Sequence, residues 1–418
     1  MTVPLKPDPD EPPGDSAMPT EPKQSPSPPP EPVQASGPDA TSEPTPPTVS
    51  VRQTVEQIEA GATVVGVQVG YTVDEVRGLL EAAIIAARRD QAPLAIPATI
   101  DELDAHYRTV VKALVDGRLV PFLGTEVNLC ARPEGANWRT DHCLPSGPEL
   151  AEYLAESFGY PAPNRQDLVR VAQYVAVVNG VGPLYDNLRT LFDADYSPTP
   201  LHQLLALVPE LLRAKGYPRS HQLIITTNYD DLLERTFESA GEPFDVVTYV
   251  AEDVAHSGQF VHKPYGSEPR VITEKVNEYQ GLPIEGLGDL TRSIILKLHG
   301  AVDRSGAQQD SFVITEDHYI DYLARQGAAA IPPNLVSKLI RTNFLFLGCS
   351  LRDWHLRVIL HRIWGGQRLS YASWAVQATT DALDQKFWRS RDVEFTSVRL
   401  EDYVAQLTTR LSALPLRT

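Results

Sequence analysis

Four short apolar runs lie between positions 119 and 350, and each stops abruptly at a glycine or a polar residue. Uninterrupted apolar runs are typical of parallel β-strands that helices cover on both faces. The carboxyl ends of such strands open into the crevice where open α/β folds bind ligands. The runs are 119–123, 223–226, 294–298 and 344–347, and they are followed by Gly124, Asn228, His299 and Ser350.

Helical periodicity around these runs predicts an α/β fold. Apolar spacing indicates helices over 99–116, before the first strand, and over 231–240, after the second. We expect loops or short hairpins over 252–288, which is rich in glycine, proline and charge. The predicted fold is a Rossmann-like parallel sheet with helices on both faces and a helical insert at about 148–214. The insert's helical segments are 148–158, 167–192 and 200–214.

The N-terminal region differs in composition from the rest of the chain. Residues 1–50 hold nearly half of the 36 prolines and almost no large apolar side chains, so we expect a disordered tail. Residues 51–98 combine a β-rich segment with an amphipathic helix over 74–89, and 99–418 form the main domain. The uncharged run Val67-Gln68-Val69-Gly70 is similar to self-assembly motifs of immune signalling proteins. A simple hairpin or edge strand is the competing interpretation.

The charge of the chain excludes some partners. Its formal net charge of −17 disfavours a general nucleic-acid binder, because such binding depends on neutralising phosphates. No stretch reaches the roughly 20 apolar residues that a membrane span requires, and no basic start precedes an apolar run. We therefore expect a cytoplasmic protein without direct nucleic-acid or membrane binding.

The strand-end motifs, taken in order, resemble those of the sirtuin-like NAD-consuming family. The resemblance covers about 119–388 and points to the bacterial branch that hydrolyses NAD instead of deacylating proteins. The motifs are Gly124-Thr125-Glu126, Thr227-Asn228-Tyr229-Asp230, Leu298-His299-Gly300 and Gly348-Cys349-Ser350.

The cysteines separate this chain from the protein-deacylating sirtuins, which resemble one another in a zinc module held by four cysteines. Only Cys130, Cys143 and Cys349 occur, without a Cys-x-x-Cys pair, so that module cannot be built. Cys130, His142 and Cys143 could contribute to a metal site, but a turn with two thiols is the favoured interpretation. We expect no metal.

The resemblance implies that Asn228 and His299 are the catalytic residues. An asparagine amide can donate and accept hydrogen bonds at once, and a neutral imidazole can take a proton from water or a ribose hydroxyl. Two structural alternatives stay open: Asn228 as a helix cap and His299 as a satisfied core histidine. Asp230 resembles the family's nicotinamide contact, but it suits a helix cap equally well.

The remaining cofactor contacts also follow from the resemblance. Gly348 and Ser350 match a Gly-x-Ser turn that binds the pyrophosphate side or the adenosine ribose, and Asp353 is expected near that ribose. Gly124, Thr125, Asn128 and Thr227 complete the expected NAD-binding set. Where the family has Gly-Ala-Gly, this chain has Glu126 in place of the second glycine, which brings bulk and negative charge towards the diphosphate. Glu126 could turn outward or be neutralised by Arg132 or Arg139.

Two functions are consistent with these residues. The first is hydrolysis of NAD to nicotinamide and ADP-ribose, with the implied role of NAD depletion in anti-phage defence. The alternative, motivated by Glu126, is a catalytically idle module that senses NAD or ADP-ribose, or that acts as a scaffold. Because NAD depletion must be restrained in a healthy cell, we expect control by self-association, by a regulatory protein partner or by an infection signal, with residues 1–98 as the candidate segment.

Overall fold

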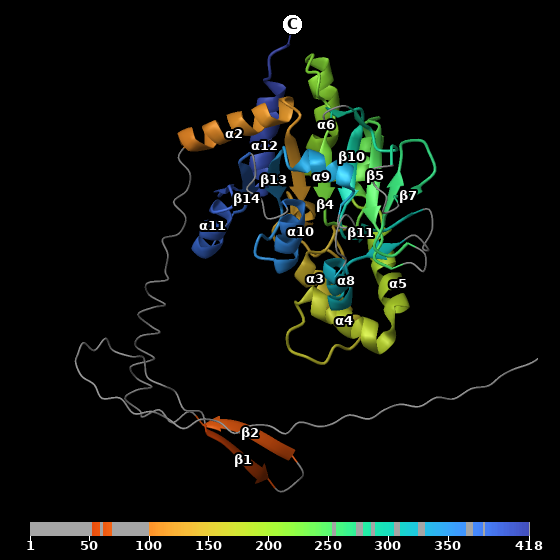
Figure 1. Cartoon of the computed structure of the whole chain (residues 1–418), viewed down its shortest axis with the longest axis vertical. Helices are drawn as coiled ribbons and strands as arrows, with labels where there is room; N and C mark the ends of the chain where they lie inside the picture. Colours follow the sequence, from red (N-terminus) through yellow and green to blue (C-terminus); the bar gives the residue numbers. More distant parts are fainter. Residues whose placement is uncertain are drawn as a thin grey trace, which may run out of the picture. The chain divides into compact units, whose positions relative to one another are not determined.

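A computed structural model of the whole chain divides it into two compact units, Met1–Ile84 and Ile85–Thr418 (Figure 1). The structure describes residues 52–58, 62–68 and 100–417, apart from 253–255, 273–278, 286–288, 305–309, 325–330, 365–370 and 379–380. The predicted disordered tail over 1–50 and the predicted helix over 74–89 lie outside the described residues.

The first unit contains an antiparallel hairpin. Strand β1 (Arg52–Ile58) pairs with β2 (Ala62–Gln68), and Val55 lies opposite Val65. This pairing matches the simple hairpin that the sequence allowed. Self-assembly through Val67 and Gln68 stays a prediction.

The second unit is built on one sheet of nine strands in the order β15-β14-β13-β3-β4-β10-β5-β6-β7. All neighbours from β15 to β5 are parallel, whereas β6 and β7 are antiparallel. The chain leaves β3 towards β4 on one side and returns to β13 on the other, so β3 is the topological switch point. The strands are β3 (Leu119–Leu123), β4 (Leu223–Thr226), β5 (Phe244–Tyr249), β6 (Phe260–Lys263), β7 (Arg270–Ile272), β10 (Ser293–Lys297), β13 (Asn343–Leu347), β14 (Ser373–Val376) and β15 (Val393–Thr396).

Helices cover both faces of this sheet because successive strand residues point to opposite sides. Ile224 belongs to the core under α2, α6, α7 and α12, while Ile225 belongs to the core under α8 to α11. The predicted doubly covered α/β fold is confirmed. The helices are α2 (Ile100–Val115), α6 (Pro200–Ala214), α7 (Leu232–Ser239), α8 (Glu316–Ala324), α9 (Pro333–Leu339), α10 (Trp354–Trp364), α11 (Ala382–Arg389) and α12 (Leu400–Ser412).

Helices α3 (Gly147–Ser157), α4 (Leu168–Asn179) and α5 (Val181–Phe192) form a third core with Phe312 of β12 (Ser311–Phe312), the strand that pairs with β11 (Gly300–Ala301). They gather beyond one end of the sheet (Figure 1). The single helical stretch expected over 167–192 is wrong, because Gly180 at φ 92° separates two helices. Helix α6 packs on the sheet and not in this cluster.

The region 252–288 contributes more regular structure than the sequence indicated. Strands β6 and β7 extend the main sheet, and β8 (Ile284–Glu285) pairs with β9 (Asp289–Leu290). The described part of the chain contains no helix that is long and apolar enough to cross a membrane.

Candidate active site at the strand ends

The sheet register brings four strand ends to the same level. Because Gly124 and Gly348 each follow a paired residue, they lie side by side at the switch point. Asn228 and His299 each lie two residues beyond a paired position on neighbouring strands, so they also lie next to each other. The last paired residues are Leu347 with Leu123, Leu123 with Thr226, and Thr226 with Lys297.

The two glycine turns interlock. The Gly124 N–H donates to the Leu347 carbonyl at 3.0 Å, and the Glu126 N–H donates to the Gly348 carbonyl at 3.1 Å. A Cβ at Gly124 would lie 2.3 Å from the Gly348 oxygen, and one at Gly348, where φ is 62°, would lie 2.5 Å from the Val127 nitrogen. Both glycines are therefore required by the close approach of two backbone segments.

Asn128 lies between the two polar residues that follow β4. Its amide Nδ2 donates to Asp230 Oδ2 at 2.7 Å, and its Oδ1 accepts from Asn228 Nδ2 at 3.5 Å. Asp230 Oδ1 also accepts from the Leu232 N–H at 3.1 Å, at the start of α7. Asp230 thus makes a local helix-start contact, whereas Asn228 does not cap that helix. Thr227 adds a backbone hydrogen bond from its N–H to the Leu123 carbonyl at 3.1 Å.

One polar atom of Asn228 is buried without a hydrogen-bond partner among the described residues. Only 6% of this residue is exposed, and its Oδ1 has no donor within reach. An unpaired buried carbonyl costs about 1–3 kcal/mol. Such a cost is typical of a functional site, where a substrate hydroxyl or a water supplies the missing donor.

His299 is 8% exposed and lies at the start of a row of aromatic rings. Its ring meets that of Tyr319 edge-on at 5.5 Å, and Tyr319 lies 6.1 Å from Trp354. Trp354 is 49% exposed at the start of α10, next to Asp353. Neither Tyr319 nor Trp354 was predicted as a site residue from the sequence, although the position of Trp354 shortly after the Gly348 motif was a usable signal.

A buried ion pair between Lys297 and Glu234 lies next to these strand ends. Lys297, which is 1% exposed, donates to Glu234 Oε1 at 2.7 Å and to the main-chain carbonyl of Asp230. Burial raises the pKa of Glu234, against the opposing effect of the Lys297 charge. This pair was not predicted from the sequence either, although a lysine inside an otherwise apolar strand is an unusual residue.

Glu126 and Asp353 are two exposed carboxylates that follow the two glycine turns. Burial by the surrounding protein, followed by the charge of Asp353, raises the pKa of Glu126. Burial also raises the pKa of Asp353, while a hydrogen bond from the Ser350 side chain lowers it. Of the options that the sequence left open, neutralisation of Glu126 by an arginine is wrong, because Arg132 contacts Glu149 at 2.8 Å and Arg139 contacts Glu156 at 2.8 Å.

The three cysteines lie apart from this site or inside the core. Cys130 and Cys349 are buried, Cys143 is partly buried, and all three are free thiols. Within the described ranges, no group of three His, Cys, Asp or Glu side chains could hold a metal ion. Thr125 is exposed at the start of the short 3-10 helix η1 (Thr125–Leu129).

Comparison with known proteins agrees with this geometry. The SIR2-like domain family matches residues 222–396. The chain is 26% identical over 257 residues to the "NAD(+) hydrolase ThsA" of Acinetobacter baumannii (strain 532279), which covers 61% of this chain and 41% of that protein. It is 24% identical over 260 residues to "Defense-associated sirtuin 2" of Bacillus subtilis, covering 61% and 20%. It is 28% identical over 220 residues to the "NAD(+) hydrolase ThsA" of Enterococcus faecium, covering 52% and 36%.

The parallel sheet with polar residues at the carboxyl ends around its switch point defines an open α/β protein with a ligand-binding crevice. The match of the SIR2-like domain over 222–396 agrees with the resemblance that the strand-end motifs implied. The chain spans less than half the length of each of these three relatives.

Proposed function

We propose that this protein hydrolyses NAD to nicotinamide and ADP-ribose at the strand-end site. The observation that carries the proposal is the buried, unpaired Oδ1 of Asn228, placed by register beside His299. A hydroxyl or water that donates to this oxygen lies within reach of a histidine that can take its proton. The two relatives named as NAD(+) hydrolases support the choice of substrate.

The residues assign a part to each step of this reaction. Cleavage breaks the bond between the ribose C1′ and the nicotinamide nitrogen, and the bonding electron pair leaves with nicotinamide. Water adds to C1′ and gives one proton to the imidazole of His299. Asn228 orients the water or the ribose hydroxyls, with Asn128 fixing its amide at 3.5 Å. Gly124, Thr125, Gly348, Ser350 and Asp353 would bind the diphosphate and the adenosine ribose.

The direct test is NAD consumption by the purified full-length protein. Nicotinamide and ADP-ribose, separated by chromatography, are expected to form in equal amounts. A cyclised product would appear as a separate peak and would redirect the mechanism. If NAD binds but no nicotinamide forms at any protein concentration, hydrolysis is wrong.

The sensor alternative is supported by Glu126, an exposed carboxylate in the glycine turn where the family has a glycine. Restoring glycine at the first of these positions discriminates between the two functions. If Glu126→Gly converts an inactive protein into an NAD hydrolase, the natural chain is a binding module. Substantial activity in the wild type shows that Glu126 is compatible with catalysis.

Glu126 also predicts a pH dependence of NAD binding. Because its pKa is raised, Glu126 takes up a proton at a higher pH than an ordinary glutamate does, and protonation removes a charge that repels the diphosphate. The KM for NAD is therefore expected to decrease as the pH is lowered. At pH 8, Glu126→Gln should lower the KM by about 5- to 30-fold, since like charges ~4 Å apart repel by ~1 kcal/mol or more. Glu152→Gln, an exposed carboxylate change on α3, is the matched control. Equal pH profiles for wild type and Glu126→Gln would contradict the repulsion.

We also propose that NAD loss serves defence against phage, a role supported by the name of the Bacillus subtilis relative. Cells that express the wild-type chain should lose NAD during infection and release fewer phage. The His299→Ala protein, expressed at the same level, should give no protection. Equal protection by both proteins would separate defence from catalysis.

A further inference from the structure

Backbone hydrogen bonds continue to join the segment after β4 to the segment after β10 beyond the last pair of the sheet. The Leu298 N–H donates to the Thr226 carbonyl at 2.9 Å. The Val302 N–H donates to the Tyr229 carbonyl at 2.9 Å. Along both segments, these two bonds bracket the proposed catalytic residues. The spacing of the two segments therefore sets how far apart those residues lie.

An ion pair between Arg304 and Asp231 joins the same two segments at their far ends. Arg304 Nε donates to Asp231 Oδ2, and Nη2 of the same guanidinium donates to Oδ1 at 3.4 Å. A guanidinium that contacts both oxygens of a carboxylate fixes direction as well as distance. The two side chains are 33% and 14% exposed, so salt and water screen this pair less than a fully exposed one.

The carboxylate of Asp231 is not used to cap the helix that it begins. Asp231 is the N-cap residue of α7, but its side chain forms no capping hydrogen bond. Asp230 Oδ1 accepts from the Leu232 N–H there instead. The oxygens of Asp231 face two guanidiniums, because Arg235 Nε also donates to Oδ1 at 3.0 Å. Its carboxylate thus serves the two arginines and not the helix start.

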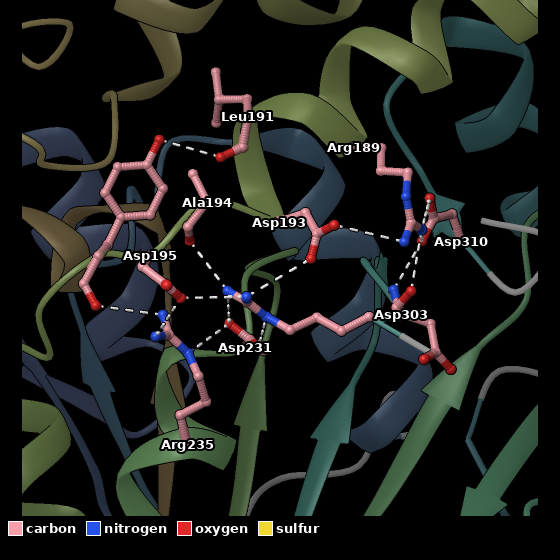
Figure 2. A network of polar contacts seen from close by, with 11 residues as sticks. Arg189, Leu191, Asp193, Ala194, Asp195, Asp231, Arg235, Asp303 and Asp310 are labelled. Carbon is pink, nitrogen blue, oxygen red and sulfur yellow. Dashed lines mark hydrogen bonds and ion pairs between the residues drawn. The ribbon is translucent and has the colours of Figure 1, made fainter. Parts of the chain in front are cut away.

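The loop that follows α5 also contacts Arg304 (Figure 2). Arg304 Nη2 donates to the Ala194 carbonyl at 3.1 Å, and Nη1 lies 3.3 Å from Asp195 Oδ1. The Asp195 side chain is 86% exposed, and exposed ion pairs contribute little. The loop and the α7 start offer different carboxylates to Arg304, so substitutions can separate the two contacts.

The proposed reaction requires the two segments to be held at a fixed spacing. Asn228 on one segment orients the water or the ribose, and His299 on the other takes the proton. A misplacement of about 1 Å between such groups lowers a rate by about 10²-fold. A contact that fixes the spacing is therefore expected to act on kcat more than on substrate binding.

We propose that Arg304 and Asp231 are positioning residues for NAD hydrolysis. Their ion pair fixes the distance between Asn228 and His299, and they act through these two residues without contacting NAD. The effect on rate rests on the proposed function, whereas the effect on the surroundings of His299 does not.

Substitution of either partner tests the effect on rate. Asp231→Asn keeps the size of the side chain but removes its charge, and Arg304→Gln removes the guanidinium. Each is expected to lower kcat for NAD hydrolysis by about 10- to 100-fold and to change the KM by less than about threefold. The double variant should lose no more than either single variant, because both remove the same interaction.

Two controls distinguish this ion pair from others. Arg139→Gln breaks the exposed pair with Glu156 on α3, and Asp195→Asn removes the loop carboxylate but leaves Asp231 in place. Both proteins should keep kcat within about twofold of the wild type. In the Asn228→Ala background, Arg304→Gln should cause no further decrease, because the residue that it positions is absent. A further decrease of about tenfold there would indicate general damage to the fold and would contradict positioning.

A second readout does not depend on activity. In the full-length protein with ¹⁵N-labelled histidine, the imidazole resonance of His299 is identified by its absence from His299→Ala. Asp231→Asn and Arg304→Gln should both shift this resonance, whereas Arg139→Gln should leave it unchanged. Thermal unfolding shows whether each variant is folded, and if one variant does not fold, the other decides.

The possible outcomes are distinct. In an active enzyme, a kcat that stays near the wild-type value in folded Asp231→Asn and Arg304→Gln overturns the proposal. If the wild type hydrolyses no NAD, the proposed function is wrong, and the His299 resonance alone decides whether the ion pair positions this residue. An unchanged resonance in both variants would then overturn the positioning as well.

Discussion

Replacing His299 with alanine is expected to lower kcat for NAD hydrolysis by about 10²–10⁴-fold, the usual effect of removing a general base. The imidazole lies at the end of β10, is 8% exposed and is held edge-on against Tyr319 at 5.5 Å. Removing it deletes the group that takes the proton but leaves the interlocked glycine turns in place. The KM for NAD should therefore change far less than kcat. Product formation followed by chromatography measures both.

His361→Ala is the matched control, because His361 is an exposed residue on α10. It should keep wild-type activity. A folded His299→Ala protein that retains more than about a tenth of the wild-type kcat would exclude His299 as the base.

Asn228→Ala extends the same test with a second readout. Activity should fall by a similar factor, because the oriented acceptor is lost. Stability should change little, since the substitution removes an Oδ1 that is buried without a partner among the described residues together with only a long 3.5 Å hydrogen bond from Nδ2 to Asn128. Loss of activity together with an equal or higher Tm is the pattern of a functional residue. A large decrease in Tm would instead indicate a structural role.

The second large effect is on stability. Lys297→Met is expected to destabilise the fold by about 3–5 kcal/mol, because it leaves the Glu234 carboxylate buried without its cation. The Asp230 carbonyl also loses a donor, so the turn that carries Asn228 should loosen. Urea unfolding at several pH values measures the free energy of unfolding.

The pH dependence of this loss has a definite sign. The pKa of Glu234 is raised in the folded state, and removing the lysine raises it further. The folded state then binds this proton more tightly than the unfolded state, so stability decreases as the pH rises above the unfolded pKa of about 4.3. The penalty of Lys297→Met should thus be larger at pH 8 than at pH 5.

The control is the double variant Lys297→Met/Glu234→Leu. Replacing both charges with apolar groups should restore most of the lost stability, because neither partner is left unpaired. Activity should stay low if the pair is required to position Asp230. A penalty below about 1 kcal/mol in the single variant would mean that Glu234 finds another partner or reaches water.

Sequence patterns predicted some elements well, and the reasons are local. Continuous apolar runs identified β3, β4, β10 and β13, and helical spacing indicated α2 and α6. The failures also have local causes. Gly180 interrupts a helical pattern that its neighbours continue. Strands β6, with four residues, and β7, with three, are too short to give a periodic signal.

The charged residues were harder to predict. The sequence offered Arg132 and Arg139 as partners of Glu126, but folding brings them to Glu149 and Glu156 on α3. Likewise, no sequence pattern connects Arg304 with Asp195 or Asp231. Partners of long side chains depend on which loops come together, and spacing along the chain does not encode this.

By itself, the sequence determined the fold class and the residues presented at four strand ends, because burial on both faces leaves a continuous apolar pattern that ends where the crevice begins. Only the tertiary structure decided which atoms meet there. Sheet register placed Asn228 beside His299, left one amide oxygen of Asn228 without a donor among the described residues, and put a buried Lys297–Glu234 pair beneath them. These contacts join strands that lie far apart in the chain, so they exist only once the sheet is assembled.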